Sequence, residues 1–380
     1  MSVVNTAIGT GHFDGLSKSS SSVSRALPFE KHLEWLRMMV LIREFEVRTM
    51  QAYQDRKIGG FCHVYIGQEA VAVGCIAATE HADPVVTAYR DHGHALARGM
   101  DPKYCMAEMF GRIGGCAKGK GGSMHMFDRD NNLFGGHGIV GAQTPLGTGL
   151  AFGTKYMDEV MNKGKNRQVT LCFLGDGALN QGALHEAMNL AGLLDVPVIY
   201  VVENNGYSMG TSIQRGTTMG DQIVAKAGAY GIMARQIDGM DVLNVYDGMK
   251  EVIDEARETS RPAFVDMRTY RFKGHSMSDP RKYRSREEEE VYETGDPIAQ
   301  LRDHMMDSGK LDEDSFKAMA KEVRGEVKES IKWAEASPPP SVEEELYRDV
   351  YVEAWGPYTG TTEPEIVRDA GSSKGEDSTS

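Results

Sequence analysis

The sequence has few of the features that mark secreted, membrane or nucleic-acid-binding proteins. Its five cysteines are an odd number without a C-x-x-C pair, so we expect neither a disulfide framework nor a zinc site, and a reducing compartment. No apolar run is long enough to span a bilayer. The formal net charge of -13 argues against a nucleic-acid or anionic-membrane partner, which would require a concentrated positive patch. These absences favour a soluble globular protein.

The N-terminal part is also short of apolar residues. Residues 1–28 are rich in Ser and Gly, and we expect a disordered tail there. This part lacks the charged-then-apolar layout of a secretory signal. For the Ser-rich stretch from Ser17 to Ser24, a plain tail is the favoured interpretation and a weak organellar leader is the alternative. One folded domain is expected to follow over residues 29–335.

The C-terminal part breaks the apolar pattern at Ser337-Pro-Pro-Pro-Ser341. We expect residues 336–380 to be an extension of the folded domain. A short docking helix is predicted from Glu343 to Tyr351, and the polar, Gly-rich residues beyond Gly356 are expected to be disordered.

Between these ends, apolar runs alternate with helical patterns. An amphipathic helix is predicted from Glu30 to Arg56, and another from Gln181 to Leu194, because apolar residues recur there at helical spacing. Four short apolar segments are predicted as strands: Val85–Ala88, Val169–Leu174, Pro197–Val202 and Ala263–Arg268. This order indicates the α/β class, with a mostly parallel sheet covered by helices on both faces.

In an open parallel sheet, ligands bind beyond the carboxyl ends of the strands. The residues that follow the predicted strands are therefore the candidates for a site. Arg90 follows the first strand, Asp176 the second and Asn205 the third, and His275 comes shortly after the fourth. Together, these strand ends supply a guanidinium, a carboxylate, a carboxamide and an imidazole.

Asp176 and Asn205 provide one anionic and one neutral oxygen, the hard ligands that magnesium prefers beside phosphate oxygens and water. Gly177 permits a sharp turn, and a helix beginning after it would point its N-terminus at a phosphate. Arg90, with His63 or His275, could balance the remaining charge. A single G-D-G is usually only a turn, but here it is paired with Asn205 across one strand–helix–strand unit. The context predicts a diphosphate-plus-magnesium site.

A glycine-rich segment, Gly114 to Gly121, offers a competing interpretation as a nucleotide-binding P-loop. It lacks the final hydroxyl residue of that motif, and the segment before it, Tyr104 to Arg112, is predicted to be helical rather than a strand. We therefore expect a mobile loop with Lys118 and Lys120 in solvent.

Several segments resemble one known family. The runs 175–178 and 203–207, Gly-Asp-Gly-Ala and Glu-Asn-Asn-Gly-Tyr, resemble the thiamine diphosphate fingerprint. Further similarity extends from about residue 30 to 300, at 61–70, 87–93, 121–127, 135–143 and 274–280. The chain resembles the alpha subunits of the pyruvate dehydrogenase decarboxylase component, within the thiamine diphosphate-dependent 2-oxo acid dehydrogenases.

The resemblance implies a role for each matching residue. Magnesium would be held by Asp176, Asn205 and the Tyr207 carbonyl. Thiamine diphosphate would be held by the following residues: His63, Tyr89, Arg90, Gly138, Val140, Asp176, Gly177, Ala178, Asn205, Tyr207 and His275. His63, His137 and His275 would act on substrate or intermediates. The role of His137 is less firmly implied, because some members carry Asn there.

The resemblance also implies the reaction and the partners. Pyruvate would be decarboxylated, and its two-carbon unit would pass to the lipoyl group of a partner dihydrolipoamide acetyltransferase. Ylid formation in this class needs a glutamate on a second domain of similar fold. The ordered part of this chain is long enough for only one such domain. A separate beta subunit in an alpha2-beta2 heterotetramer is therefore implied.

Three alternatives stay open at this level. The substrate could be a branched-chain 2-oxo acid or acetoin instead of pyruvate. The chain could also be a non-catalytic scaffold. A cytoplasmic location of the bacterial type is expected, with the mitochondrial matrix as the alternative. Animal members are switched off by phosphorylation in the loop that here holds Ser276 and Ser278, but a second serine of theirs is absent after Pro280.

Overall fold

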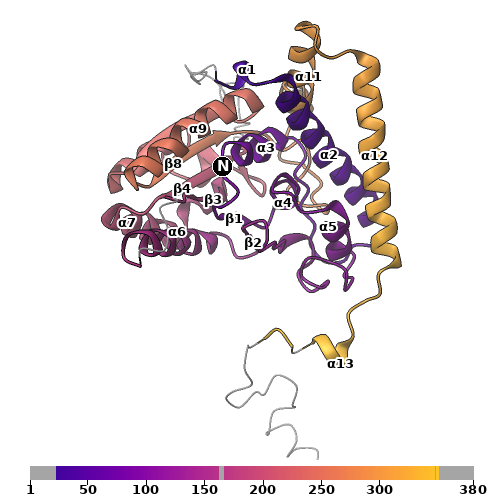
Figure 1. Ribbon diagram of the computed structural model, residues 1–380, viewed down its shortest axis with the longest axis horizontal. Coiled ribbons are helices and arrows are strands. Elements are labelled where there is room, and N and C mark those ends of the chain that lie inside the picture. The colour runs from indigo at the N-terminus through magenta and orange to yellow at the C-terminus, as the bar shows by residue number, and fades with distance from the viewer. Residues whose placement is uncertain (1–22, 162–166, 347, 351–380) are drawn as a thin grey trace, which may run out of the picture. The chain divides into compact units, whose positions relative to one another are not determined.

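The computed structural model describes residues 23–161, 167–346 and 348–350. The chain divides into a unit that ends at Ser337 and a second that begins at Pro338. The described residues of the second unit include one short helix, α13 (Val342–Glu345). All strands described below belong to the first unit (Figure 1).

The first unit is built on a parallel sheet of six strands in the order β2-β1-β3-β4-β8-β7. Every neighbouring pair is parallel, which confirms the predicted fold class. The strands are β1 (Val85–Ala88), β2 (Leu133–His137), β3 (Thr170–Gly175), β4 (Val198–Asn204), β7 (Met233–Asp238) and β8 (Ala263–Arg268).

The two strands of this sheet that were not predicted, β2 and β7, lie at its edges. β2 reads Leu-Phe-Gly-Gly-His, and its two glycines weaken the apolar signal of a strand. β7 reads Met-Ala-Arg-Gln-Ile-Asp, half of it polar, and is only partly buried. Edge strands are covered less completely than central ones, so a continuous apolar run is not required of them.

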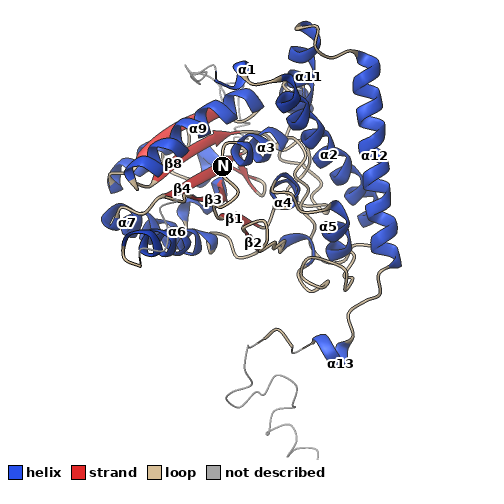
Figure 2. Cartoon of the chain, in the orientation of Figure 1, coloured by secondary structure: helices blue, strands red, loops and turns tan. Residues whose placement is uncertain are grey.

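Helices cover both faces of the sheet (Figures 1 and 2). One face carries α3 (Glu69–Ala77) and α9 (Val242–Thr259), with α2 (Phe29–Gln54) packed against α3. The other carries α6 (Gln143–Glu159), α7 (Gly182–Leu194) and the 3-10 helix η4 (Ile223–Tyr230). Residues of β3 alternate between the two cores: Leu171 and Phe173 join the first, whereas Cys172 and Leu174 join the second.

The remaining elements are short, except for one long helix. α12 (Glu313–Ala336) runs beside α2 and packs against α5 (Pro102–Met109) (Figure 1). The others are α1 (Val23–Ala26), α4 (His92–Ala97), η2 (Gly122–Met124), η3 (Asp176–Asn180), the hairpin β5 (Tyr207–Ser208) and β6 (Thr211–Ser212), α8 (Ile213–Gly216), α10 (Arg286–Glu293) and α11 (Pro297–Asp307). No described helix has the length and apolarity that crossing a membrane requires.

The chain ends differ from the predictions where they are described. Residues 23–28, expected to be disordered, include α1, and Ser24 is fully buried there. The Ser24 amide and hydroxyl each donate a hydrogen bond of 2.7 Å to the Asp247 carboxylate, a long-range contact that composition cannot reveal. Residues 1–22 and 351–380, including most of the Ser-rich stretch and the predicted C-terminal tail, lie outside the described residues. α13 is shorter than the predicted docking helix, and its docking role stays a prediction.

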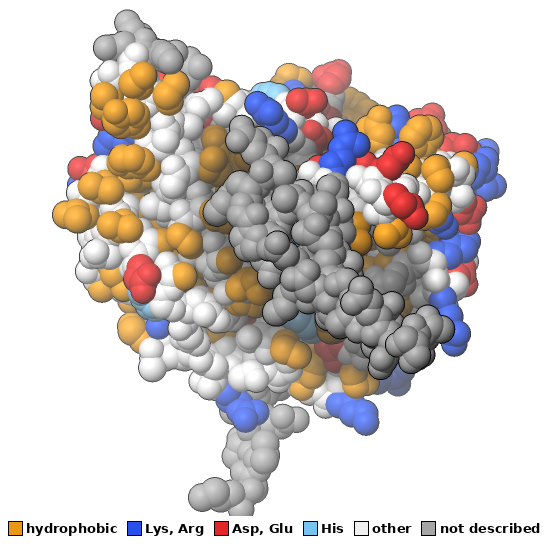
Figure 3. Space-filling view, turned by 90° about the horizontal axis from the view of Figure 1, so that it is seen from below, with side chains coloured by type: hydrophobic (Ala, Val, Ile, Leu, Met, Phe, Trp, Pro, Cys, Tyr) orange, Lys and Arg blue, Asp and Glu red, His pale blue; other side chains and the backbone are white. Residues whose placement is uncertain are grey.

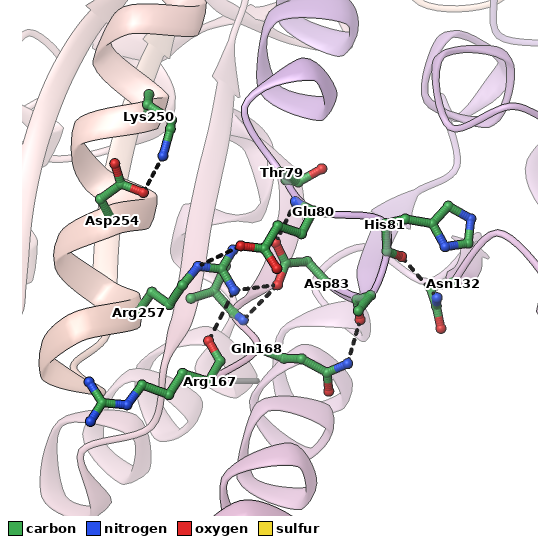
Figure 4. Close-up of polar contacts among 12 residues, drawn as sticks. Thr79, Glu80, His81, Asp83, Asn132, Arg167, Gln168, Lys250, Asp254 and Arg257 are labelled. Carbon is green, nitrogen blue, oxygen red and sulfur yellow. Dashed lines mark hydrogen bonds and ion pairs between the residues drawn. The ribbon is translucent and has the colours of Figure 1, made fainter. Parts of the chain in front are cut away.

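At the amino ends of the strands, Asp83 ties α9 to the sheet (Figure 4). Its carboxylate accepts two hydrogen bonds from the Arg257 guanidinium, at 3.0 and 2.6 Å. It also accepts from the backbone amides of Glu80 and Val169. Because Asp83 is fully buried, this paired charge fixes the edge of the sheet opposite the strand ends that were predicted to bind ligand.

A second buried pair fixes the segment that contains His63. The Glu46 carboxylate of α2 lies 3.0 Å from Nδ1 of His92 in α4 and accepts a 2.7 Å hydrogen bond from the Tyr65 amide. Burial lowers the pKa of His92, but Glu46 and Asp91 outweigh it, so the pKa is raised overall. The other ring nitrogen of His92, Nε2, contacts two uncharged groups of Ser123, its backbone carbonyl and its hydroxyl. The fold therefore favours the protonated form of His92 beside the Glu46 carboxylate.

Replacing Glu46 by glutamine is expected to destabilise the fold by about 2 kcal/mol in mildly acidic solution, because hydrogen bonds to charged groups contribute about 1.5–3 kcal/mol. The folded-state pKa of His92 lies above its unfolded value of about 6.5, so the contribution is complete below that pH. It is lost as the pH rises through the folded-state value. Urea unfolding at about pH 6 and about pH 9 checks this. An equal cost of Glu46→Gln at both pH values would contradict the assignment.

Candidate active site

A cavity of about 540 Å³ lies beyond the carboxyl ends of β1, β3 and β4. Its lining includes all the residues predicted to hold the cofactor: His63, Tyr89, Arg90, Gly138, Val140, Asp176, Gly177, Ala178, Asn205, Tyr207 and His275. They come from segments far apart in the sequence, and the parallel sheet brings them together at one edge.

His137 is absent from the described residues that line this cavity. It ends β2, is half-buried, and its Nε2 lies 3.1 Å from the Phe134 carbonyl oxygen. Its ring packs edge-on against Phe127, with 5.8 Å between the ring centroids. Burial lowers the pKa of His137. The structure thus places it beside the cavity residue Gly138 rather than inside the cavity.

Asp176 is 5% exposed, and its Oδ2 has no hydrogen-bond partner among the described residues. Burial raises the pKa of this carboxyl to about 6, against the opposing effect of the Arg271 guanidinium. A buried carboxylate oxygen without a partner is costly unless a cation binds it. A Cβ atom at the next residue, Gly177, would lie 2.3 Å from the Ser208 hydroxyl, so any other residue there would displace Ser208.

The helix predicted from Gln181 to Leu194 is confirmed, because α7 spans Gly182–Leu194 with Gln181 as its N-cap. A 3-10 helix that was not predicted, η3 (Asp176–Asn180), lies between β3 and α7. This tight turn places Gly177 and Ala178 in the cavity wall, where their backbone is close to any ligand of Asp176. Phosphate binding at the N-terminus of α7 stays a prediction.

Asn205 lies in the turn that follows β4, and hydrogen bonds from neighbouring side chains hold this turn in place. The Asn204 carboxamide accepts from the Gly206 amide at 3.2 Å and donates to the Asp266 carboxylate of β8 at 2.8 Å. Gly206 has a φ of +80°, which favours glycine. The Asn205 side chain donates to Gln68 Oε1 at 3.1 Å. Its own oxygen accepts only a long 3.4 Å contact from the Tyr207 amide among the described residues, so it is available to a ligand.

Imidazole rings and a guanidinium form the opposite wall. The centroid of the His63 ring lies 4.6 Å from that of Tyr89 and 5.1 Å from that of His275. Arg90 donates to the carbonyl oxygens of Val64 and His275, both at 2.7 Å. Burial, together with the charges of Arg90 and Arg271, lowers the pKa of His275 to about 3. Both the ring and the guanidinium are thus fixed before any ligand binds, and His275 is neutral at pH 7.

Comparison with protein families agrees with this geometry. A family model described as dehydrogenase E1 component matches residues 37–343. The chain belongs to the dehydrogenase E1 component family.

Its relatives in this family share most of its length. Proteins named pyruvate dehydrogenase E1 component subunit alpha from Rickettsia bellii and Rhizobium meliloti are each 48% identical to it. The first match covers 85% of this chain and 96% of the relative, and the second 84% and 90%. A chloroplastic alpha-3 subunit of the same name from Arabidopsis thaliana is 39% identical, over 89% of this chain and 78% of the relative.

The structure of this E1 family member also reveals cavity residues that the sequence reasoning missed. Gln68, Glu203 and Arg271 all line the cavity and are buried. Arg271 Nε has no hydrogen-bond partner in the described part of the chain. Burial and the nearby Arg284 and Arg90 lower the pKa of Arg271 to about 9. Since Arg271 comes three residues after the end of β8, and Arg90 two residues after the end of β1, the strand-end rule could have found it.

The glycine-rich loop of this E1 chain is not the mobile segment that was predicted. The Glu108 carboxylate accepts hydrogen bonds from the backbone amides of Ala117, Gly119, Gly121 and Gly122, at 2.7 to 3.1 Å. An internal carboxylate therefore occupies the amide nest that a P-loop would offer to a phosphate. Lys120 is exposed, as predicted, but Lys118 is half-buried. The P-loop interpretation fails for the physical reason that its anion site is already filled.

Proposed function

We propose that this chain is the alpha subunit of a pyruvate dehydrogenase E1 component. With thiamine diphosphate and magnesium, the enzyme decarboxylates pyruvate oxidatively and acetylates the lipoyl group of a partner acetyltransferase. The observation that carries the proposal is the cavity lined by Asp176, Asn205 and Tyr207, in which Oδ2 of the Asp176 carboxylate has no hydrogen-bond partner among the described residues. The names of its relatives at 48% identity support the substrate. We also propose a cytoplasmic location, because these two relatives are bacterial proteins, with the mitochondrial matrix as the alternative.

The chemistry of the lining fits a magnesium diphosphate. Asp176 Oδ2, Asn205 Oδ1 and the Tyr207 carbonyl are oxygen ligands of the kind that magnesium prefers. The residues proposed to surround the diphosphate are His63, Tyr89, Arg90, Gly177, Ala178 and His275. Backbone atoms of Gly138 and Val140 would contact the aminopyrimidine. When bound, the cofactor would supply the electron sink that decarboxylation requires.

This chain's own histidines would orient the substrate and move protons. His275 is neutral at pH 7, because burial and two arginines keep its pKa low, so one ring nitrogen can accept a proton. Burial also lowers the pKa of His63, with Arg90 and His275 as further causes. His137, beside the cavity, is proposed to meet the substrate carboxylate.

Two surfaces support a beta subunit as partner. Several apolar cavity residues are exposed at the same time, among them Phe61, which is 67% exposed, Val140 and Met209. A second apolar surface covers α6 and α7, and hydrophobic side chains gather on their side of the molecule, at the left of Figure 3. Its exposed residues are Leu146, Phe152, Tyr156, Met157, Leu190, Leu193 and Leu194. Extended apolar surfaces of this kind mark interfaces. An alpha2-beta2 heterotetramer that completes the active site is our proposal.

The substrate is tested with the reconstituted alpha–beta pair. We expect kcat/KM for pyruvate to exceed that for 3-methyl-2-oxobutanoate by at least about 10-fold, since a pocket discriminates by about 10- to 200-fold per methylene. Acetoin serves as a third substrate in the same assay. A preference for the branched acid or for acetoin would overturn the assignment to pyruvate.

A further inference from the structure

A fully buried carboxylate, that of Glu108, lies in the last turn of α5. A negative charge is unfavourable at this place, because the carboxyl end of a helix is the negative end of its dipole. Burial away from water adds to the cost. The position is therefore unfavourable for α5 alone, and the groups that the carboxylate binds must compensate for it.

The glycine-rich loop that follows α5 supplies those groups. Oε2 of Glu108 accepts hydrogen bonds from the amides of Ala117 and Gly119, at 2.7 and 2.9 Å. Oε1 accepts from the amides of Gly121 and Gly122, at 2.7 and 3.1 Å. The amides converge because Gly119 and Gly122 have φ of +75° and +66°, in the left-handed region. Converging amide dipoles repel one another unless an anion lies between them, so Glu108 stabilises the loop in this conformation.

The segment 123–126 follows this loop directly, and its first two residues contact the cavity. The Ser123 hydroxyl accepts a hydrogen bond of 3.3 Å from the His63 amide and lies 2.9 Å from His92 Nε2. Met124 lines the cavity itself. The short helix η2, which ends at Met124, packs against α5. The loop is thereby connected to His63, which is proposed to surround the diphosphate.

His125 connects the same segment to a second part of the cavity wall. Its Nδ1 lies 3.0 Å from the Gly136 carbonyl oxygen of β2. A Cβ atom on Gly138 would lie 3.1 Å from Cε1 of the His125 ring, so the ring packs closely against this glycine. Backbone atoms of Gly138 are proposed to contact the aminopyrimidine. The segment thus touches residues proposed for both the diphosphate and the aminopyrimidine.

We propose that Glu108 is a positioning residue for the cofactor. By occupying the amides of the loop, it holds the segment 123–126 where His63 and Gly138 can receive thiamine diphosphate, and this inference rests on the proposed function. Glu108 itself is absent from the described residues that line the cavity. Without its carboxylate, the segment is correctly placed in only a fraction of the molecules. The apparent dissociation constant of the cofactor then rises by the inverse of that fraction.

The test measures the dissociation constant of thiamine diphosphate by calorimetry, for variants of the alpha–beta assembly in saturating magnesium. Glu108→Gln keeps the volume of the side chain but turns an NH2 group toward two of the four amides, which lose their acceptor. We expect the dissociation constant to rise by about 10-fold or more, because one hydrogen bond to a charged group contributes at least about that factor.

Glu108→Ala shows whether the carboxylate acts through the amides of the loop. The truncation leaves four amides converging on a space that a small carboxylate can fill. Added formate is therefore expected to restore cofactor binding in Glu108→Ala, and to change nothing in the wild type or in Glu108→Gln, where a side chain fills that space. Formamide has a similar size but no charge, and it should not restore binding. All samples are kept at one ionic strength, so that screening is constant.

Asp101→Ala is the matched control for the stability of α5. Asp101 caps the other end of the same helix, where its carboxylate accepts a 2.9 Å hydrogen bond from the Lys103 amide. Removing this cap weakens α5 without changing the partners of the loop amides. The Tm of this variant should fall, whereas its dissociation constant for thiamine diphosphate should equal that of the wild type.

The outcomes separate this inference from the proposed function. A wild-type assembly that does not bind thiamine diphosphate refutes the proposed function. If the wild type binds it and Glu108→Gln binds it equally well, Glu108 is not a positioning residue. Weak binding in Glu108→Ala that formate does not improve, or an equal loss in Asp101→Ala, would mean that Glu108 acts only through the stability of α5, and either result overturns the inference.

Discussion

Asp176→Ala is expected to lower the affinity for magnesium and thiamine diphosphate by at least about 10²-fold, the largest effect of any single substitution in this cavity. Truncating one partner of a buried charge pair costs about 2–5 kcal/mol, and about 2.7 kcal/mol is a factor of 10². Asp176 is the buried carboxylate whose Oδ2 lacks a partner in the described structure. Neutral Asn205 and a backbone carbonyl cannot replace its charge.

Binding is measured by calorimetry and by the ligand-dependent Tm of the alpha–beta assembly. Lys120→Ala is the control, because Lys120 lies in the glycine-rich loop whose amides bind Glu108, and this variant should bind like the wild type. The opposite pattern, with binding lost in Lys120→Ala and kept in Asp176→Ala, would restore the P-loop interpretation. A Tm insensitive to both ligands in the wild type would favour a scaffold.

The central strands of the fold could be predicted because burial on both faces of the sheet requires a run of apolar residues in the sequence. β3 and β4 are covered on both faces, so apolar residues predominate in them: Leu171–Leu174 in β3 and Val198–Val202 in β4 form nearly continuous apolar runs. The edge strands β2 and β7 are under no such constraint. Glycines in β2 and polar residues in β7 interrupt the apolar run by which the other strands were predicted. The segment at Ser24 was missed for a different reason, since its order depends on Asp247, a residue more than 200 positions away.

Strand positions alone predicted only those residues of the site that directly follow a strand. Asp176 and Asn205 follow apolar strands, and the topology of a parallel sheet brings such residues together. Gln68 and Glu203 carried no comparable signal: the first precedes a helix, and the second resembles any polar residue closing a strand. They are held by three-dimensional contacts, Gln68 with Asn205 and Glu203 with Tyr65, which no spacing rule expresses.

The same cavity indicates why one chain should not be sufficient. Phe61, Val140 and Met209 line the cavity, yet they also expose much of their apolar surface in this single chain. Ile139, beside Val140, is 76% exposed. A site that excludes water needs a cover over these residues. None of the described residues does this fully, so a second chain is the natural candidate.

The isolated alpha chain is accordingly expected to show no measurable decarboxylation of pyruvate. We propose that the glutamate that activates the cofactor belongs to a beta subunit, and removing a proton-transferring group costs about 10²- to 10⁴-fold in rate. Release of carbon dioxide from labelled pyruvate is measured for alpha alone, beta alone and the mixture. Activity should rise with added beta chain and saturate at equal amounts of the two chains.

A surface variant shows whether assembly itself is responsible. Leu193 on α7 is 74% exposed and lies outside the cavity, so Leu193→Glu should leave the fold of alpha unchanged. If α6 and α7 contact a neighbouring subunit, this charge shifts the saturation curve to higher beta concentration, because an unpaired charge in an apolar interface is costly. Glu186→Gln, on the same helix, is the control, because it removes a charge where Leu193→Glu adds one. Turnover by purified alpha chain without any beta chain would show that this cavity is complete by itself.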